Sequence, residues 1–338
     1  MNLSSPSEIK ALLQKNGFNF SKALGQNFLI NPSVCPRMAE AAIPGPEYGV
    51  IEVGPGIGVL TVELAQRAQK VIAIELDERL YPILDETLAD YPNAHVVPGD
   101  ILEVDLHKLI ADEFTLRDEA GDPVLDESGA PRLMPLVLCA NLPYYITSPV
   151  IMKLLSEDLP IENLTVMVQK EAADRLCADV GTRAAGAVTV AIQYYAEAEQ
   201  LFFVSKGSFL PAPKVDSEVI RLTLRQPGTS AGSSASSGSS ASASSAANSA
   251  AGAANSAAGA ANTDRLSKED ADRFFKMVQA GFSQRRKTIM NSFSAALGMN
   301  KADLGELLDS VDVPRAARIE QLTMDQLLAV YKASRKVV

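Results

Sequence analysis

The chain has 338 residues, of which 47% are hydrophobic and 21% charged, and its formal net charge is -10. This composition excludes a wholly disordered or fibrous protein and suffices for one large domain or two ordinary ones. No apolar run reaches membrane-spanning length, no signal peptide is evident, and three scattered cysteines indicate no disulfide framework. The two histidines lack metal-ligand spacing, which argues against a zinc site and a Ser-His-Asp hydrolase. We therefore expect a soluble, cytoplasmic protein with no metal and no membrane partner.

The charge is distributed unevenly along the chain. Residues 46–227 carry 14 basic and 29 acidic side chains, whereas residues 1–45 have a net charge of +2 and residues 263–338 of +3. Local patches, more than total charge, decide what a surface binds. The negative total therefore does not exclude a nucleic-acid partner, and we expect any such contact at the basic ends.

The pattern of hydrophobic residues predicts a helix at the start and then alternating strands and helices. Ser5 to Glu8 has the pattern of a capping box with a proline at the first helical position, and Gly17 fits the end of that helix. Short apolar strands separated by helical segments are typical of a mostly parallel sheet covered on both faces. The predicted strands are 50–53, 71–74, 95–97, 136–140 and 164–168, with 201–204 and 219–224 as a closing pair.

Two segments interrupt this pattern. Residues 113–135 are rich in Asp, Glu, Gly and Pro, which predicts an acidic surface insertion. Residues 228–262 carry no charge and only small side chains, which predicts a flexible Ser/Ala/Gly linker. Capping boxes at 267–270 and 323–326 then predict a small helical domain. The expected organisation is an N-terminal segment 1–45, an α/β domain 46–227, the linker 228–262 and an all-α domain 263–338.

A glycine-rich turn and two carboxylates follow the predicted strands. Residues 54–58, Gly-Pro-Gly-Ile-Gly, come after a strand and open a helix, where glycines let the backbone pass close to a ligand. Val59 breaks the dinucleotide spacing and disfavours a nicotinamide oxidoreductase, and the ending required for a P-loop is missing. Glu75 closes the second strand, where it would accept both ribose hydroxyls, and Asp100 closes the third, where it would accept from an adenine amine. Each carboxylate alone also fits a solvated loop residue or helix cap.

Residues 141–144, Asn-Leu-Pro-Tyr, follow the fourth strand and are the most informative segment. The exocyclic amine of adenine is a poor nucleophile because its lone pair is delocalised into the ring. The Asn141 side-chain oxygen and the Leu142 carbonyl would accept its two N–H bonds and favour the charge that develops on nitrogen. Pro143 stiffens the loop, and Tyr144 offers a ring on which an extruded base would stack. The alternative is a simple turn with a packed tyrosine.

Four segments of the chain together resemble the ribosomal RNA adenine N6-dimethyltransferase family, in the form that modifies two adjacent adenines of the small-subunit (16S) rRNA. They are residues 22–29, 51–56, 141–146 and 209–217. The resemblance covers nearly the whole chain apart from the acidic insertion and the linker, which leave the geometry between the domains open. It implies a Rossmann-like class I methyltransferase domain, a small helical C-terminal domain and S-adenosylmethionine as methyl donor, with no metal.

The resemblance also implies roles for individual residues. Tyr144 and Phe209 would sandwich the flipped adenine, although a phenylalanine before a Pro-x-Pro turn fits core packing equally well. The donor would contact Asn27, Leu29, Gly54, Gly56, Glu75, Asp100 and Asn141, and the reaction site would comprise Asn141, Leu142, Pro143, Tyr144 and Phe209.

The implied reaction is direct transfer of a methyl group to N6, twice, in a 3'-terminal hairpin of 16S rRNA within the immature small subunit, by a monomer. We expect Arg285, Arg286, Lys287 and Lys22 to bind RNA, with Lys10 and Lys15 nearby, although the C-terminal cluster also fits a solvated helix face. Three alternatives stay open. They are a large-subunit rRNA methyltransferase of the antibiotic-resistance type, a DNA adenine methyltransferase, and a non-catalytic RNA-binding assembly factor.

Overall fold

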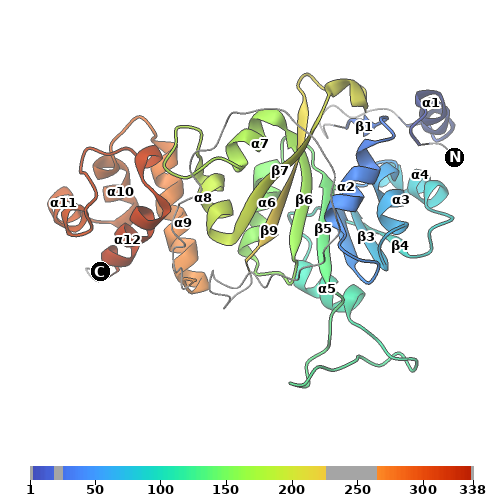
Figure 1. Cartoon of the computed structure of the whole chain (residues 1–338), viewed down its shortest axis with the longest axis horizontal. Coiled ribbons are helices and arrows are strands. Elements are labelled where there is room, and N and C mark those ends of the chain that lie inside the picture. The colour runs from blue at the N-terminus through green and yellow to red at the C-terminus, as the bar shows by residue number, and fades with distance from the viewer. Residues whose placement is uncertain (1–2, 19–25, 226–264, 336–338) are drawn as a thin grey trace, which may run out of the picture.

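The protein folds into an α/β domain with a helical domain at one end, as the computed structural model in Figure 1 shows. The structure describes residues 3–18, 26–225 and 265–335. Residues 228–262, predicted to be a flexible linker, therefore lie outside the described residues, as does Lys22.

A seven-stranded sheet forms the centre of the α/β domain, with strand order β4-β3-β2-β5-β6-β9-β7. The first five strands of that order are parallel, and β9 and β7 close the sheet in antiparallel pairing. This confirms the mostly parallel sheet expected from the apolar strand pattern. The strands are β2 (Gly49–Val53), β3 (Lys70–Glu75), β4 (Ala94–Pro98), β5 (Leu136–Asn141), β6 (Asn163–Gln169), β7 (Ala196–Val204) and β9 (Ser217–Leu224). The hydrophobic pattern located all seven but missed the first half of β7, whose residues are mostly polar and exposed.

Helices cover both faces of the sheet because alternate strand residues point to opposite sides. Odd positions of β2, such as Ile51, join a hydrophobic core with α5, α6 and α8. Val50 on the same strand instead packs with α2 and α3. The helices of this domain are α1 (Pro6–Lys15), α2 (Val34–Ala42), α3 (Val59–Ala65), α4 (Tyr81–Thr87), α5 (Leu106–Phe114), α6 (Thr147–Ser156), α7 (Lys170–Leu176) and α8 (Ala187–Tyr195).

A second, two-stranded sheet was not predicted from the sequence. It pairs β1 (Phe28–Leu29) with β8 (Phe209–Leu210), in the register Phe28 with Leu210 and Leu29 with Phe209. Segments 180 residues apart thus lie side by side above the carboxyl ends of the parallel strands, at the top of Figure 1. Strands of two residues give no periodic signal, so only tertiary structure could reveal this pairing.

Residues 115–133 form an arm that extends from the opposite edge of the sheet (Figure 1). The arm leaves the end of α5 and returns to the start of β5, and isolated bridges such as Thr115 with Leu133 hold it together. Two similar turns cap it: Asp118 Oδ1 accepts from the backbone of Ala120 and Asp122, and Asp126 Oδ1 accepts in the same way from Ser128 and Ala130. The acidic residues of this arm are therefore exposed, and they lie at the end of the sheet opposite the carboxyl ends of the parallel strands.

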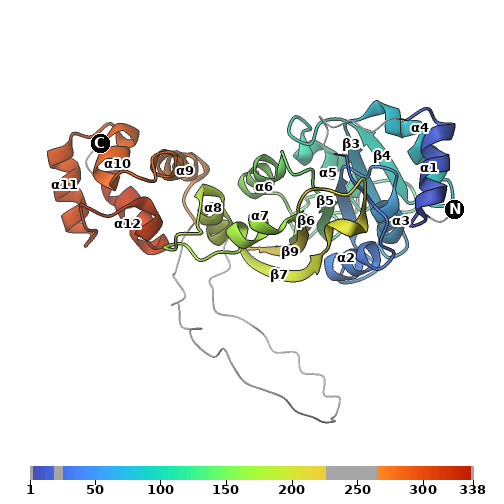
Figure 2. The same cartoon turned by 90° about the horizontal axis from the view of Figure 1, so that it is seen from above.

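The helical domain packs directly against the α/β domain, beside α8 (Figure 2). Phe274 and Phe275 contact Tyr194 and Tyr195 of α8, and both domains share one hydrophobic core. A guanidinium N–H of Arg265 also donates to the Arg225 carbonyl, so the two ends of the undescribed segment 226–264 meet. The domain contains α9 (Lys268–Ser283), α10 (Ile289–Leu297), α11 (Lys301–Ser310), η3 (Ile319–Gln321) and α12 (Met324–Ser334).

Candidate active site

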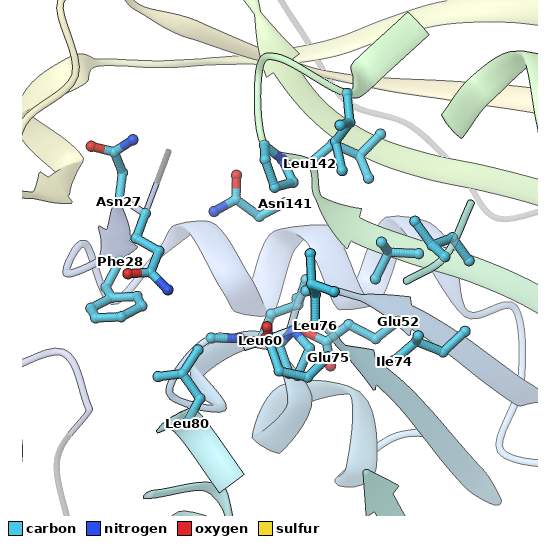
Figure 3. A pocket seen from close by; sticks show the side chains of 18 of the residues that line it. Asn27, Phe28, Glu52, Leu60, Ile74, Glu75, Leu76, Leu80, Asn141 and Leu142 are labelled. Carbon is cyan, nitrogen blue, oxygen red and sulfur yellow. Dashed lines mark hydrogen bonds between the residues drawn. The ribbon is translucent and has the colours of Figure 1, made fainter. Parts of the chain in front are cut away.

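A cavity lies at the carboxyl ends of β2, β3 and β5, the edge at which open α/β sheets place their ligands. It encloses about 1040 Å³, including solvent at its mouth. Figure 3 shows Asn141 and Leu142 on one side of the cavity, Glu75 and Leu60 across from them, and Asn27 with Phe28 on a third side. Every residue predicted for donor binding or reaction lines this single cavity: Asn27, Leu29, Gly54, Gly56, Glu75, Asp100, Asn141, Leu142, Pro143, Tyr144 and Phe209.

The glycine-rich turn follows β2 as predicted. Gly54 has φ of +68°, and a Cβ built there would meet nothing within 4 Å, so the cavity reaches its backbone. Gly56 has φ of +62°, and a Cβ there would lie 3.1 Å from the Phe28 ring. Both positions require glycine, because other residues rarely adopt this backbone conformation. The turn therefore opens the floor of the cavity to a ligand.

Glu75 connects this turn to the next strand. Its Oε2 accepts from the Gly56 backbone N–H at 3.2 Å and its Oε1 from Asp77 N–H at 2.8 Å. Burial raises the pKa of Glu75, and the backbone hydrogen bonds act in the opposite direction. Each carboxylate oxygen retains a second lone pair, so the group can still accept hydroxyl donors. Asp100 lies at the rim and accepts from the Leu102 N–H at 2.9 Å.

The residues predicted to act on an amine follow β5. Asn141 is the last residue of that strand, and Leu142 N–H donates to the Met167 carbonyl at 3.3 Å. Within the described ranges, neither the Asn141 side chain nor the Leu142 carbonyl has a hydrogen-bond partner, and both residues line the cavity. Two oxygen acceptors are therefore available side by side at the cavity wall.

Aromatic rings flank these acceptors. The Tyr144 hydroxyl lies 2.9 Å from Ser217 Oγ, which anchors the ring, and burial raises the pKa of this tyrosine. Phe209 is only 3% exposed and belongs to the hydrophobic core on the α2 side, so it has a packing role as well as a place at the cavity. Tyr145, by contrast, is 53% exposed at the cavity wall. The predicted stacking on Tyr144 and Phe209 stays a prediction.

Glu52 also lines the cavity and belongs to segment 51–56 of the family resemblance, but no role was predicted for it from the sequence. Glu52 of β2 is only 1% exposed, and burial raises its pKa to about 8. Its Oε2 has no hydrogen-bond partner in the described structure. The signal that could have drawn attention to Glu52 is an acidic residue within an otherwise apolar strand. Its burial, however, depends on packing from α2 and α3.

The residues predicted to bind RNA fall into two groups. Arg286 and Lys287 are exposed between α9 and α10. Arg285 instead contacts Glu320 at 3.0 Å, donates to the Arg183 carbonyl at 2.7 Å and lies over the Phe282 ring. Arg285 therefore joins the helical domain to the α7–α8 loop, a role that the sequence did not suggest. Lys15, near the N-terminus, pairs with Glu86.

The described part of the chain holds no group of three or more His, Cys, Asp or Glu side chains that could bind a metal ion. None of the helices within these described ranges has the length and apolar character needed to cross a membrane.

Comparison with known proteins decides the family. A family model described as ribosomal RNA adenine dimethylase matches residues 17–234. The chain belongs to the ribosomal RNA adenine dimethylase family. Two relatives carry the name ribosomal RNA small subunit methyltransferase A. The one from Geobacillus sp. (strain WCH70) is 38% identical over 99% of both chains, and the one from Geobacillus thermodenitrificans (strain NG80-2) is 39% identical over 98% of this chain and 96% of that protein.

Comparison with solved structures supports the same fold. A dimethyladenosine transferase from Plasmodium falciparum superimposes with a TM-score of 0.61 at 23% identity, covering 89% of this chain and 95% of that one. The 23S rRNA methyltransferase ErmE gives 0.56 at 26% identity, covering 91% and 100%. The predicted family and the Rossmann-like class I methyltransferase fold with a helical C-terminal part are thereby confirmed, and this family member is a methyltransferase.

The cavity fits the methyl donor that such an enzyme requires. The open space above Gly54 provides room, and the buried carboxylates of Glu75 and Glu52 suit a ligand with hydroxyl groups and positive charge. The cavity lining offers carboxylates, side-chain amides and backbone groups, which are the hydrogen-bonding partners that a nucleoside needs.

Proposed function

We propose that the protein transfers methyl groups from S-adenosylmethionine to N6 of two adjacent adenines in a 3'-terminal hairpin of 16S rRNA, giving N6,N6-dimethyladenosine. The small-subunit relatives, 38–39% identical over nearly the whole chain, support this choice of substrate. The substrate would be the immature small ribosomal subunit in the cytoplasm, and the enzyme would act as a monomer.

The observation that carries the proposal is the position, at the end of β5, of two acceptors that have no hydrogen-bond partner in the part of the chain that the structure describes. The Asn141 side chain and the Leu142 carbonyl line the same cavity as the glycine-rich turn and Glu75. An adenine amine has two N–H donors, which these acceptors match in number and chemistry. A catalytic site for amine methylation needs this combination of a nucleoside-binding floor and paired acceptors.

The residues of the floor would bind the donor. Glu75 would accept its ribose hydroxyls, Asp100 its adenine amine, and Gly54 and Gly56 would pass beneath it. Asn27 and Leu29 would border its methionine part. When bound, S-adenosylmethionine supplies an electrophilic methyl group attached to a positively charged sulfur.

The wall residues would prepare the acceptor nitrogen. Asn141 and Leu142 would accept the amine's N–H bonds, which localises the nitrogen lone pair and stabilises positive charge that develops on it. Pro143 would hold the loop rigid, and Tyr144 and Phe209 would stack on the extruded base. Catalysis would therefore come from positioning and amine polarisation rather than from a strong general base.

The direct test supplies isotopically labelled S-adenosylmethionine to small subunits that lack the modification and identifies the labelled nucleoside. We expect N6,N6-dimethyladenosine at two adjacent positions near the 3' end of 16S rRNA. Label in 23S rRNA instead would favour the large-subunit activity, which the 26% identity with ErmE keeps as the second candidate. If no label is transferred but the protein still supports subunit maturation, the non-catalytic assembly role would replace the proposal.

A further inference from the structure

Strand register places Glu52 directly beneath the donor cavity. Glu52 pairs with Ala73 of β3 and Cys139 of β5, and aligned residues in a parallel sheet point to the same face. Two residues further along, about 7 Å up the strands, the same face presents Glu75 and Asn141 at either side of Gly54. Gly54 contributes no side chain between Glu75 and Asn141, and Glu52, one layer below them, also lines the cavity.

The Glu52 carboxyl is buried without the partners that a buried carboxylate needs. It is 1% exposed, and its Oε2 has no hydrogen-bond partner in the described structure. The Thr61 hydroxyl of α3 lies close enough to lower the pKa of Glu52, but among the described residues it too has no hydrogen bond of ordinary geometry. A buried ionised carboxylate without partners is costly, so the neutral acid is favoured.

The groups that face Glu52 provide no positive charge. Cys35 of α2 and Cys139 of β5 are buried thiols whose pKa values the nearby Glu52 helps to raise. Glu75 of β3 is a second carboxylate, and its charge adds to burial in raising the pKa of Glu52 to about 8. Among the described residues, these are the titratable groups that interact with Glu52, and none is a cation.

We propose that Glu52 is the group that senses the charge of the methyl donor: it is protonated in the free protein and releases its proton when cationic S-adenosylmethionine binds. This inference rests on the proposed function, because it takes that donor as the ligand. The Glu52 O–H bond breaks, the electron pair stays on the carboxylate oxygen, and the proton goes to solvent or buffer. The product S-adenosylhomocysteine has a neutral sulfur and leaves the proton in place. Glu52 thereby favours donor over product.

The sign of the pH dependence follows from proton linkage. Binding that releases a proton becomes tighter as pH rises towards the pKa of the group and levels off above it. Donor affinity is therefore expected to increase up to about tenfold per pH unit below the Glu52 pKa of about 8. Product affinity is expected to lack this component.

Calorimetry in buffers of different ionisation enthalpy counts the protons. At about pH 7 we expect wild-type protein to release about one proton more per donor bound than Glu52→Gln, since glutamine cannot ionise. Subtracting the proton release of Glu52→Gln from that of the wild type removes the protons exchanged by the methyl donor's own amino group. Glu40→Gln, which changes an exposed carboxylate on α2, is the matched control and should behave as wild type. With S-adenosylhomocysteine, wild type and Glu52→Gln should release equal numbers of protons.

Equal proton release by wild type and Glu52→Gln on donor binding would overturn the inference while leaving the proposed function intact. Failure of wild-type protein to bind S-adenosylmethionine would instead refute the proposed function. If Glu52→Gln does not fold, infrared difference spectra of the wild type give the same answer. The carbonyl stretch of a protonated carboxyl should disappear on addition of donor and persist on addition of product, and a band unchanged by donor would reject the inference.

Discussion

Asn141 and Asn163 lie on neighbouring strands at opposite edges of one sheet, and their surroundings differ completely. Asn141 ends β5, and among the described residues its side chain, at the cavity wall, has no hydrogen-bond partner. Asn163 begins β6, is 8% exposed, and donates to the Ala42 carbonyl while accepting from the Thr165 hydroxyl. The same side chain thus lines a cavity at the end of one strand and, at the start of the next, links β6 to α2.

Exchange of each asparagine for alanine gives the largest expected contrast. Asn141→Ala should lower kcat by about 100-fold or more, because it removes an acceptor that acts on developing charge. Its stability should hardly change, since the side chain makes no hydrogen bond in the described structure. Asn163→Ala should instead lower the free energy of unfolding by about 1–3 kcal/mol and leave kcat of the folded enzyme near wild type.

Methylation rates with small-subunit substrate, together with thermal unfolding, measure both effects. A variant Asn141→Ala that retains full kcat would remove this residue from the proposed chemistry. Full stability in Asn163→Ala would show that its two hydrogen bonds contribute little.

Arg285 and Arg286, neighbours in the helical domain, differ in the same way: one makes internal contacts and the other is exposed. Arg285→Ala should destabilise the protein by about 1–2 kcal/mol, because it breaks the pair with Glu320 and the hydrogen bond to the Arg183 carbonyl. Arg286→Ala should leave stability unchanged and weaken RNA binding several-fold. Its affinity should depend less on salt, since one phosphate contact contributes about 0.7–0.9 to the logarithmic slope.

Binding of an rRNA hairpin at several salt concentrations, with unfolding curves for both variants, tests this difference. If Arg286→Ala binds RNA as wild type does while Arg285→Ala does not, the RNA contact would belong to Arg285 despite its internal bonds.

The smallest effect is expected from removing the arm at the amino edge. Thr115 and Leu133 face each other as an antiparallel bridge, so a short Gly-Ser turn can replace residues 116–132. Because the arm is exposed and lies at the edge opposite the cavity, stability should change by less than about 0.5 kcal/mol. Initial rates of methylation should stay within about twofold of wild type, which corresponds to about 0.4 kcal/mol of activation free energy, because none of the arm's residues lines the cavity. A loss beyond that would assign the arm a role in substrate recognition.

The sequence by itself determined the strands of the central sheet apart from the first half of β7, the glycine-rich turn after β2, and the polar residues that end β3 and β5. These features depend on local rules: apolar runs form buried strands, glycines permit positive φ, and ligands collect where parallel strands end. Asn141, Glu75 and Gly54 could therefore be selected from the amino-acid sequence alone.

Only the tertiary structure decided which residues become partners across long separations. It seated Phe209 beside Leu29, turned Arg285 towards Glu320, brought Arg265 to Arg225 and buried Glu52 beneath Gly54. No local pattern encodes these contacts, because each depends on how whole helices and strands pack. Burial in particular changes what a carboxyl group does, and the sequence alone cannot distinguish a solvated glutamate from one enclosed between two helices and a sheet.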